Sequence, residues 1–348
     1  MKKKRLYNKV NKEELKEKLL QSAEPRTTLS FYRYANIEDV QAFRDKLFAE
    51  WSKLDVFGRT YVAKEGINAQ ISLPTTNLEA FRKQLYAIPF MDNTRLNIAV
   101  EDDGKSFYVL KIKIREKILA DGLNDDTFDV TNKGVHLSAE KFNEITADPN
   151  TVLIDMRNHY ESEVGHFESA VTPDVETFRE SLPIIEKMIE EDKEKNIVMY
   201  CTGGIRCEKA SAYYKHKGFK NVYQLEGGII EYARQVEAEG LENKFKGKNF
   251  VFDERMGERI SEEVISKCHQ CGTASDNHIN CANDACHILF LQCENCAEIY
   301  NNCCSEKCKD FIKLPEEERK ELRKTMVFNG TKFGKGRYKA NREGGLED

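Results

Sequence analysis

The chain of 348 residues is long enough for two or three packed domains rather than one. Hydrophobic residues make up 40% of it and charged residues 32%, which supports folded cores and excludes a collagen-like chain. No apolar run approaches the roughly 18 residues that a membrane span needs, and no apolar signal segment follows the basic N-terminus. A cytoplasmic protein with no membrane partner is therefore expected.

Residues 1–28 are predicted to form a basic helical lead-in that ends near Pro25. A ferredoxin-like, or acylphosphatase-like, α+β domain is predicted over residues 29–120, because strand and helix patterns follow one another there as βαββαβ with an extra strand. Apolar residues three or four positions apart indicate the helices, and apolar–polar alternation indicates the strands. The expected strands cover residues 29–34, 67–73, 96–100 and 107–115, and the helical stripes cover residues 40–54 and 78–88.

The last of these strands carries three cations on one face, Lys111, Lys113 and Arg115. The apolar residues that alternate with them, Leu110, Ile112 and Ile114, are expected to lie on the opposite face. A solvated edge strand and a face that contacts phosphate groups both explain this pattern. The three cations are therefore candidate RNA contacts.

An α/β domain with a mainly parallel sheet is predicted over residues 134–240, where strands and helices alternate. Ligands should gather at the carboxyl ends of its strands. The expected strands are 151–156, 197–200 and 221–225, and the expected helices are 138–145, 177–189, 207–217 and 228–237.

A loop of sequence Cys-Thr-Gly-Gly-Ile-Arg-Cys joins one of these strands to a helix. Its backbone N–H groups and the helix N-terminus favour a thiolate at Cys201, and Arg206 adds a fixed cation. Cys207 fits either a packing role or that of a second redox thiol. The predicted catalytic residues are Cys201 and Arg206, in a loop formed with Thr202, Gly203, Gly204 and Ile205.

Three further segments, residues 152–157, 163–170 and 222–229, resemble the sequence of rhodanese domains. In that family the loop cysteine carries a persulfide, so the resemblance assigns this role to Cys201. The loop between Cys201 and Arg206 is also one residue shorter than in related phosphatases, which favours sulfur chemistry. Asp155 and Arg157 are candidate supporting residues, with a scaffold ion pair as the alternative, and His166 is expected to belong to the scaffold.

Nine of the eleven cysteines lie in a probable zinc module over residues 250–313. Two Cys-x-x-Cys pairs among them are typical of tetrahedral zinc sites. Eight thiolates suffice for two such sites, but the spacing does not reveal their pairing, and His269, His278 or His287 could replace a thiolate. An iron–sulfur cluster and disulfides are the alternatives to one or two structural zinc ions. The candidate ligands are Cys268, Cys271, Cys281, Cys286, Cys293, Cys296, Cys303, Cys304 and Cys308, with Cys303 or Cys304 left over.

Residues 314–348 are predicted to form a basic tail. Between Arg319 and Arg342 nine Lys/Arg residues accompany one acidic residue, although the whole chain has a net charge of −5. Aromatic residues, among them Phe328, Phe333 and Tyr338, alternate with these cations, which suits RNA phosphates and stacked bases. A solvated tail is the alternative. The candidate RNA contacts are Lys332, Lys335, Arg337 and Lys339.

The combined order of domains resembles the bacterial rhodanese-domain tRNA uridine(34) hydroxylases, most clearly over residues 62–68, 178–180 and 201–209. This resemblance implies oxygen-dependent conversion of the wobble uridine of tRNA to 5-hydroxyuridine, with Cys201 as the essential cysteine. Molecular oxygen would be the co-substrate, and the sequence has no glycine fingerprint of a flavin or NAD site. Addition of a thiolate or persulfide to C6 of uracil is our hypothesis for the chemistry. The alternatives are a sulfurtransferase that acts on RNA or a small acceptor, and an RNA-binding adaptor.

Overall fold

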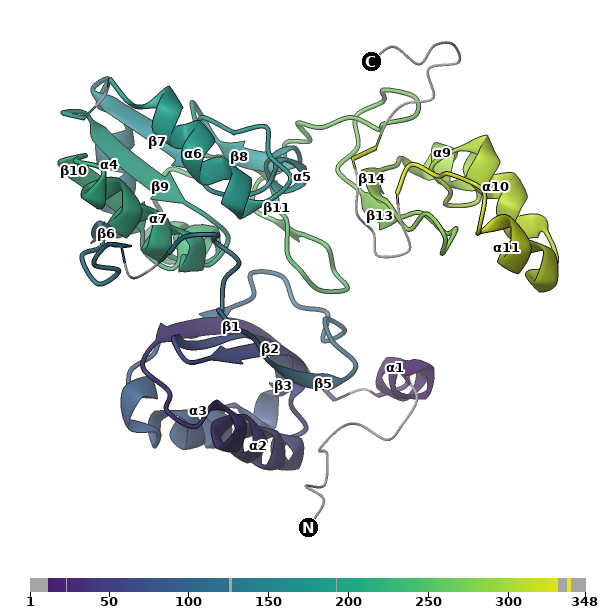
Figure 1. Cartoon of the computed structure of the whole chain (residues 1–348), viewed down its shortest axis with the longest axis horizontal. Helices are drawn as coiled ribbons and strands as arrows, with labels where there is room; N and C mark the ends of the chain where they lie inside the picture. The colour runs from purple at the N-terminus through teal and green to yellow at the C-terminus, as the bar shows by residue number, and fades with distance from the viewer. Residues whose placement is uncertain (1–11, 23, 125–126, 192, 331–336, 339–348) are drawn as a thin grey trace. The chain divides into compact units, whose positions relative to one another are not determined.

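The computed structural model describes residues 12–22, 24–124, 127–191, 193–330 and 337–338 (Figure 1). The chain forms two compact units. The first contains the described residues up to Asn158 together with Ser169–Lys244 and Val251–Arg259, and the second contains His159–Glu168, Phe245–Phe250 and the described residues from Ile260 onward. None of the described helices has the length and apolar character that crossing a membrane requires.

The lead-in contains one described helix, α1 (Lys12–Leu20). The first strand, β1 (Arg26–Tyr34), begins at Arg26 rather than at Leu29. The reason is that Arg26 is anchored: its guanidinium lies 4.3 Å from the centroid of the Phe57 ring and donates a 2.9 Å hydrogen bond to the carbonyl of Ser72. These contacts hold the backbone before Leu29 in the sheet.

Five strands form the sheet of the N-terminal domain, in the order β4-β1-β3-β2-β5. All neighbouring pairs are antiparallel except β2 and β5, which are parallel. The ferredoxin-like order with an extra strand is therefore confirmed. The remaining strands are β2 (Phe57–Ala63), β3 (Gly66–Pro74), β4 (Asn97–Ile98) and β5 (Leu110–Ile114).

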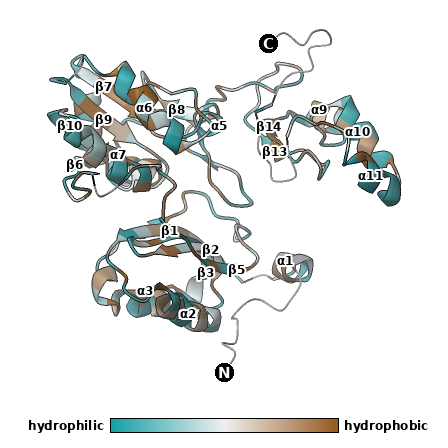
Figure 2. Ribbon diagram, in the orientation of Figure 1, coloured by the Kyte–Doolittle hydropathy of each residue, from teal (hydrophilic) through white to brown (hydrophobic). Residues whose placement is uncertain are grey.

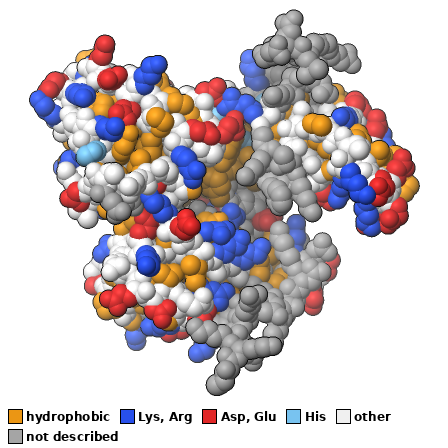
Figure 3. Space-filling view, in the orientation of Figure 1, with side chains coloured by type: hydrophobic (Ala, Val, Ile, Leu, Met, Phe, Trp, Pro, Cys, Tyr) orange, Lys and Arg blue, Asp and Glu red, His pale blue; other side chains and the backbone are white. Residues whose placement is uncertain are grey.

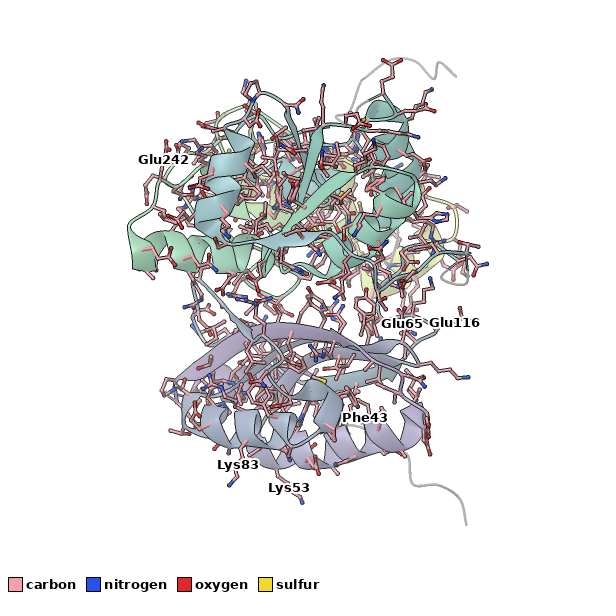
Figure 4. The ribbon with its side chains drawn as sticks, turned by 90° about the vertical axis from the view of Figure 1, so that its left-hand side faces the viewer. Phe43, Lys53, Glu65, Lys83, Glu116 and Glu242 are labelled. Carbon is pink, nitrogen blue, oxygen red and sulfur yellow. The ribbon has the colours of Figure 1, made fainter. Side chains whose placement is uncertain are left out.

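Two helices, α2 (Val40–Trp51) and α3 (Leu78–Tyr86), cover one face of this sheet, and Lys53 and Lys83 point away from it (Figure 4). The core lies between the helices and the sheet, where the rings of Phe31, Trp51 and Phe81 meet at centroid distances of 5.5–6.2 Å. Short 3-10 turns lie at Ser52–Leu54, Thr75–Asn77 and Pro89–Met91. Because neighbouring side chains of a strand point to opposite faces, the residues between those of the core face away from the helices.

A second, fully parallel sheet has the strand order β6-β10-β9-β7. Its strands are β6 (Val135–Leu137), β7 (Thr151–Asp155), β9 (Asn196–Tyr200) and β10 (Asn221–Leu225), and only β6 was not predicted. Four helices accompany it: α4 (Ala139–Thr146), α6 (Phe178–Met188), α7 (Ile205–His216) and α8 (Gly228–Glu239). Hydrophobic residues run along β9 and α6 (Figure 2), which contribute to the core of this α/β domain.

The second unit combines two hairpin-like strand pairs with short helices. β8 (Gly165–Phe167) pairs with β11 (Phe245–Asn249), and β13 (His278–Asn280) pairs with β14 (Leu289–Leu291), both antiparallel. Its helices are α5 (His159–Ser162), α9 (Glu294–Tyr300), α10 (Glu306–Lys313) and α11 (Glu316–Leu322), while the two-residue β12 (Glu258–Arg259) belongs to the first unit. Cysteines form much of the small core around Ile288 and Phe290. A core of this kind needs cross-links or bound metal to be stable.

Candidate active site

The thiol loop begins where β9 ends. Cys201 directly follows Tyr200, and α7 starts at Ile205. The N–H group of Gly204 donates a 3.1 Å hydrogen bond to the Cys201 sulfur. Gly204 has a φ of +98°, a left-handed conformation that glycine adopts readily and that turns this N–H toward the sulfur. The loop therefore wraps backbone donors around the side chain of Cys201.

These donors decide the ionisation state of the two loop cysteines. Burial of Cys201 opposes its ionisation, but a hydrogen bond from Cys207, the charge of Arg206 and the backbone N–H groups of both residues outweigh it. The pKa of Cys201 is lowered to about 6. Burial and the neighbouring Cys201 raise the pKa of Cys207 well above its ordinary value. Near neutral pH, Cys201 is therefore the thiolate and Cys207 the thiol that donates to it.

The start of α8 clamps the thiol loop from the other side. The N–H of Ile229 donates to the carbonyl of Cys201 at 3.0 Å, and the N–H of Ile230 donates to that of Thr202 at 3.3 Å. Gly228 makes this approach possible, because a Cβ there would lie 2.4 Å from the Cys201 carbonyl oxygen. The Gly227-Gly228 pair that resembles the rhodanese sequence thus has a direct role in positioning the loop.

Asp155 and Arg157 form a buried ion pair beside the loop. The Arg157 guanidinium donates to both carboxylate oxygens of Asp155, at 2.9 and 2.6 Å, and the Tyr200 hydroxyl adds a 2.8 Å bond. The pair therefore orients the end of β9, as the scaffold alternative describes. His166, in the second unit, is 2.9 Å from the carbonyl of Ser162 through Nδ1.

A pocket of about 330 Å³ opens at the thiol loop, entirely within the first unit. The loop supplies one wall through Cys201, Thr202 and Arg206. The opposite wall is the face of the N-terminal sheet that its helices leave uncovered. That wall includes Thr28, Ser30, Tyr32, Asn68, Gln70 and Asn97. The pocket thus places hydrogen-bonding groups of one domain in the same cavity as the thiolate of the other.

Direct contacts hold the two walls together. The Asn97 amide Nδ2 donates to the carbonyl of Gly203 at 3.2 Å, and Arg95 forms an ion pair with Glu226 at 2.5 Å. Arg234 of α8 donates to the carbonyl of Ile98 at 2.7 Å. Sequence analysis missed all three contacts, because each joins residues more than 100 positions apart.

Tyr32 is a further residue at the loop that sequence analysis did not identify. Its hydroxyl donates to Glu208 at 3.1 Å, and Glu208 also contacts His136 at 2.9 Å and Lys133 at 2.6 Å. Burial and the negative charges of Glu208 and Cys201 raise the pKa of Tyr32 well above its ordinary value. Tyr32 therefore remains a protonated hydrogen-bond donor on the wall of the pocket.

Comparison with known proteins agrees with this architecture. Residues 26–118 match the UPF0176 acylphosphatase-like domain, residues 138–235 the rhodanese-like domain, and residues 246–309 the family described as rhodanase C-terminal. A protein of Yersinia enterocolitica named tRNA uridine(34) hydroxylase is 60% identical over 329 residues, which is 94% of each chain. One of the same name from Photorhabdus laumondii is 56% identical over 96% of this chain and 95% of its own. The chain belongs to the tRNA uridine(34) hydroxylase family.

The fold class predicted from the sequence is accordingly confirmed for this member of the family: an acylphosphatase-like domain, a rhodanese domain and a cysteine-rich C-terminal region.

Eight cysteines of this family member form two clusters that could each hold a metal ion. Within each cluster all four sulfur atoms lie within 4.8 Å of one another. Sulfur–sulfur distances of 3.6 Å in the first cluster and 3.7 Å in the second approach the about 3.8 Å expected around a tetrahedral ion with Zn–S bonds near 2.3 Å. The first cluster is Cys268, Cys271, Cys293 and Cys296, and the second is Cys281, Cys286, Cys304 and Cys308. The pairing is interleaved, and Cys303 is the cysteine outside both clusters.

N–H groups surround the second cluster. Gly330 donates to the Cys286 sulfur at 3.3 Å, and the backbone of Cys304 donates to the Cys281 sulfur at 3.4 Å. Such donors stabilise the negative charge of metal-bound thiolates. The three histidines lie outside the clusters: His269 contacts Glu163 at 2.7 Å, and the ring of His278 packs against Phe250. His287 is likewise not part of either cluster.

The described part of the basic tail packs onto the cysteine-rich region. Phe328 contacts the ring of Phe311 at 5.0 Å, and Tyr338 stacks on Phe290 at 5.5 Å and on His269 at 5.0 Å. Phe328 and Tyr338 thus pack against protein rings, and stacking of the tail on RNA bases stays a prediction. Arg337 is exposed, and Lys332, Phe333, Lys335 and Lys339 lie outside the described residues.

Lys111 and Lys113 of the edge strand β5, and Arg115 directly after it, are exposed. Lys and Arg side chains gather near this edge on the face shown in Figure 3. Arg115 lies 5.6 Å from the centroid of the Tyr61 ring. Leu110 and Ile112 are buried, whereas Ile114 is 41% exposed. Ile114 is the last residue of the strand, where the core no longer covers it.

Proposed function

We propose that this chain converts uridine 34 of tRNA to 5-hydroxyuridine, with Cys201 as the nucleophile. The observation that carries the proposal is the position of Cys201. A thiolate with a pKa of about 6 lies in the wall of a pocket of about 330 Å³. Membership of the tRNA uridine(34) hydroxylase family supports the same activity.

The size of the pocket favours a single nucleotide turned out of its stack. Its volume is at the lower end of the about 300–1,000 Å³ that small-molecule sites span, so it admits a base and not a helix. Enzymes that modify a base take it into such a pocket, and the energetic cost is lowest for a nucleotide that is already unpaired. A wobble uridine in an anticodon loop meets this condition.

The chemistry that we propose begins with addition of the Cys201 thiolate, or of a persulfide on it, to C6 of uracil. The electron pair of the C5–C6 double bond moves toward C5 and the C4 carbonyl, which makes C5 nucleophilic. Molecular oxygen would supply the hydroxyl oxygen at C5, and two electrons from a reductant, together with two protons, would convert the other oxygen atom to water. Loss of the C5 proton and of the sulfur then restores the double bond. Arg206, whose charge favours the thiolate, stabilises the leaving sulfur in the last step.

The exposed cations of the N-terminal sheet and of the basic tail are proposed to bind the phosphates of the tRNA and not to take part in catalysis. One exposed row of cations runs along β5 and directly past its end, and it consists of Lys111, Lys113 and Arg115. The basic tail carries further positive charge. Each phosphate that they neutralise releases counterions, so binding should weaken as salt increases. We assign tRNA binding to residues 29–120 and 314–348, and catalysis to residues 134–240. The reaction is proposed to take place in the cytoplasm.

The two cysteine clusters are proposed to hold one structural zinc ion each within residues 250–313. All four positions of each site are filled by thiolates, which leaves no open position for a substrate. Because the surrounding core is small, metal binding would supply much of the folding free energy of this region.

A sulfurtransferase remains the second candidate function, because the same low-pKa loop cysteine suits a persulfide. Mass spectrometry of tRNA nucleosides from cells that lack the protein distinguishes the hydroxylase function from the sulfurtransferase function. Loss of 5-hydroxyuridine and its derivatives, restored by the wild-type chain and not by Cys201→Ser, supports the hydroxylase. Loss of thionucleosides with 5-hydroxyuridine unchanged would select the sulfurtransferase instead.

A further inference from the structure

One wall of the pocket is a row of polar residues on the uncovered face of the N-terminal sheet. Thr28, Ser30 and Tyr32 alternate along β1 with Leu29 and Phe31, which are buried in the helix-covered core. Asn97 of β4 lies at the edge of this row, beside the thiol loop. A polar face that meets a cavity instead of bulk water is suited to recognise a ligand.

Asn97 is the residue of this wall whose hydrogen bonding is incomplete. Its side chain is 2% exposed and lines the pocket. The carbonyl of Gly203 accepts a hydrogen bond at 3.2 Å, so the atom that faces it must be the Nδ2 donor, and this contact fixes the orientation of the amide. The other atom, Oδ1, is buried and has no hydrogen-bond partner among the described residues. Such an acceptor is costly unless a ligand or a water molecule supplies a donor.

The donor pattern of uracil matches this acceptor. The Watson–Crick edge of uracil presents one N–H group, at N3, between two carbonyl oxygens. Cytosine presents a lone pair at N3, which an amide oxygen would repel. The hydroxyl group of Ser30, on the same wall, offers a donor for a carbonyl oxygen.

We propose that Asn97 Oδ1 accepts the N3–H group of the substrate base and makes the pocket selective for uridine over cytidine; this inference rests on the proposed function. N3 and C6 lie on opposite sides of the pyrimidine ring. A base held at N3 by Asn97 therefore presents its C5–C6 edge away from the sheet wall. Because the same amide holds Gly203, recognition of the base and the position of the Cys201 loop are linked through one side chain.

The test compares full-length tRNA substrates that carry uridine, N3-methyluridine or cytidine at position 34, using the full chain. For the wild-type enzyme we expect N3-methylation to lower kcat/KM by about 100-fold or more, because a buried acceptor then lacks its donor. Asn97→Ala should lower kcat/KM on uridine by about 10- to 100-fold. For this variant, kcat/KM on N3-methyluridine should be less than about threefold below its kcat/KM on uridine. Asn97→Ser serves as a second variant, since it keeps a small polar side chain but no longer offers the amide oxygen.

A matched control comes from Asn68, which lines the same pocket but donates to the carbonyl of Ile118 at 3.3 Å. Asn68→Ala should keep the wild-type discrimination against N3-methyluridine. The pH profile of Cys201 alkylation should be unchanged in the Asn97 variants, which shows that the loop is intact.

Equal discrimination in wild type and both Asn97 variants, or indifference of the wild type to N3-methylation, would overturn the inference while leaving the hydroxylase function in place. Failure of the wild type to hydroxylate uridine 34 at all would instead overturn the proposed function.

Discussion

The ammonium group of Lys209 lies 2.9 Å from the carboxylate of Glu65 and connects the two domains that form the pocket. Lys209 belongs to α7, one turn beyond the thiol loop, and its side chain is 3% exposed. Glu65, in the turn between β2 and β3, is labelled where the two domains meet in Figure 4. Two of the three segments that most resemble the hydroxylase family, residues 62–68 and 201–209, thus contact each other.

Replacing Lys209 with methionine should lower the free energy of unfolding by about 3 kcal/mol, because it leaves the largely buried carboxylate of Glu65 without its cation. A double-mutant cycle with Glu65→Gln should give a coupling energy of about 1–3 kcal/mol in urea denaturation. Lys220→Met is the matched control: its partner Glu194 is 75% exposed, and a change below about 0.5 kcal/mol is expected. Similar losses for both lysines would show that the Glu65 contact is no stronger than a surface pair.

Cys201→Ser should abolish hydroxylation without loss of fold, because it removes only the soft nucleophile. Cys207→Ser should be milder, since a serine hydroxyl can still donate to the thiolate. Nucleoside mass spectrometry after reaction, together with circular dichroism of each variant, measures both effects. Complete loss of activity in both variants with intact folds would point to a two-thiol redox cycle instead.

The rate of Cys201 alkylation should rise as pH increases through about 6, since the thiolate form reacts and its pKa is about 6. Below that pH the thiol is protonated and the rate falls. Arg206→Ala removes a charge that stabilises the thiolate, so the midpoint should move up, toward the ordinary value of about 8.5. Iodoacetamide labelling followed by peptide mass spectrometry isolates Cys201 from the other cysteines. An unchanged midpoint in Arg206→Ala would mean that backbone donors alone set the pKa.

The purified chain should contain about two zinc ions when no chelator is used. Replacement of Cys293 and Cys296 by serine should remove one ion and strongly destabilise the second unit, because metal binding there contributes folding free energy. Cys303→Ala is the matched control, since Cys303 lies outside both clusters, and it should retain both ions. Elemental analysis that finds iron, or less than one ion with paired thiols, would contradict the assignment.

Charge reversal at Lys111, Lys113 and Arg115 should raise KM for tRNA and leave kcat at saturation nearly unchanged. The slope of log K against log salt should flatten by about 0.7–0.9 for each phosphate that the protein no longer neutralises. For the tail, replacing Lys332, Lys335 and Lys339 with glutamine is preferable to truncation after Lys324, because truncation would also remove Phe328 and Gly330 from the cysteine-rich core. An unchanged KM and salt slope in both sets would show that neither surface binds tRNA.

Features formed by residues that are close in the sequence could be predicted from it, whereas contacts between distant parts of the chain could not. The thiol loop could be predicted because its cysteine, glycines and arginine are contiguous, and strand alternation correctly separated Leu29 and Phe31 from the polar side of β1. The alternation of apolar and polar residues along a strand indicates that one face of the sheet is polar, but it does not indicate what covers that face. The roles of Tyr32 and Asn97 arise only because a separate domain docks there. The cysteine pairing was undetermined for the same reason, since Cys-x-x-Cys spacing describes one half of a site and not its partner.

The interleaving of the two cysteine clusters also constrains how the chain is made. The second cluster begins at Cys281, before the first is completed by Cys296, so neither site consists of a contiguous segment. When Cys296 emerges from the ribosome, the nascent chain holds one complete set of ligands, while Cys304 and Cys308, which complete the second set, are still inside the exit tunnel. During this interval thiols of the two clusters can bind the same metal ion in the wrong combination. The interval ends when Cys308 of α10 emerges. The second site is therefore completed late in synthesis, and a chain that stops before Cys308 lacks its full set of four thiols.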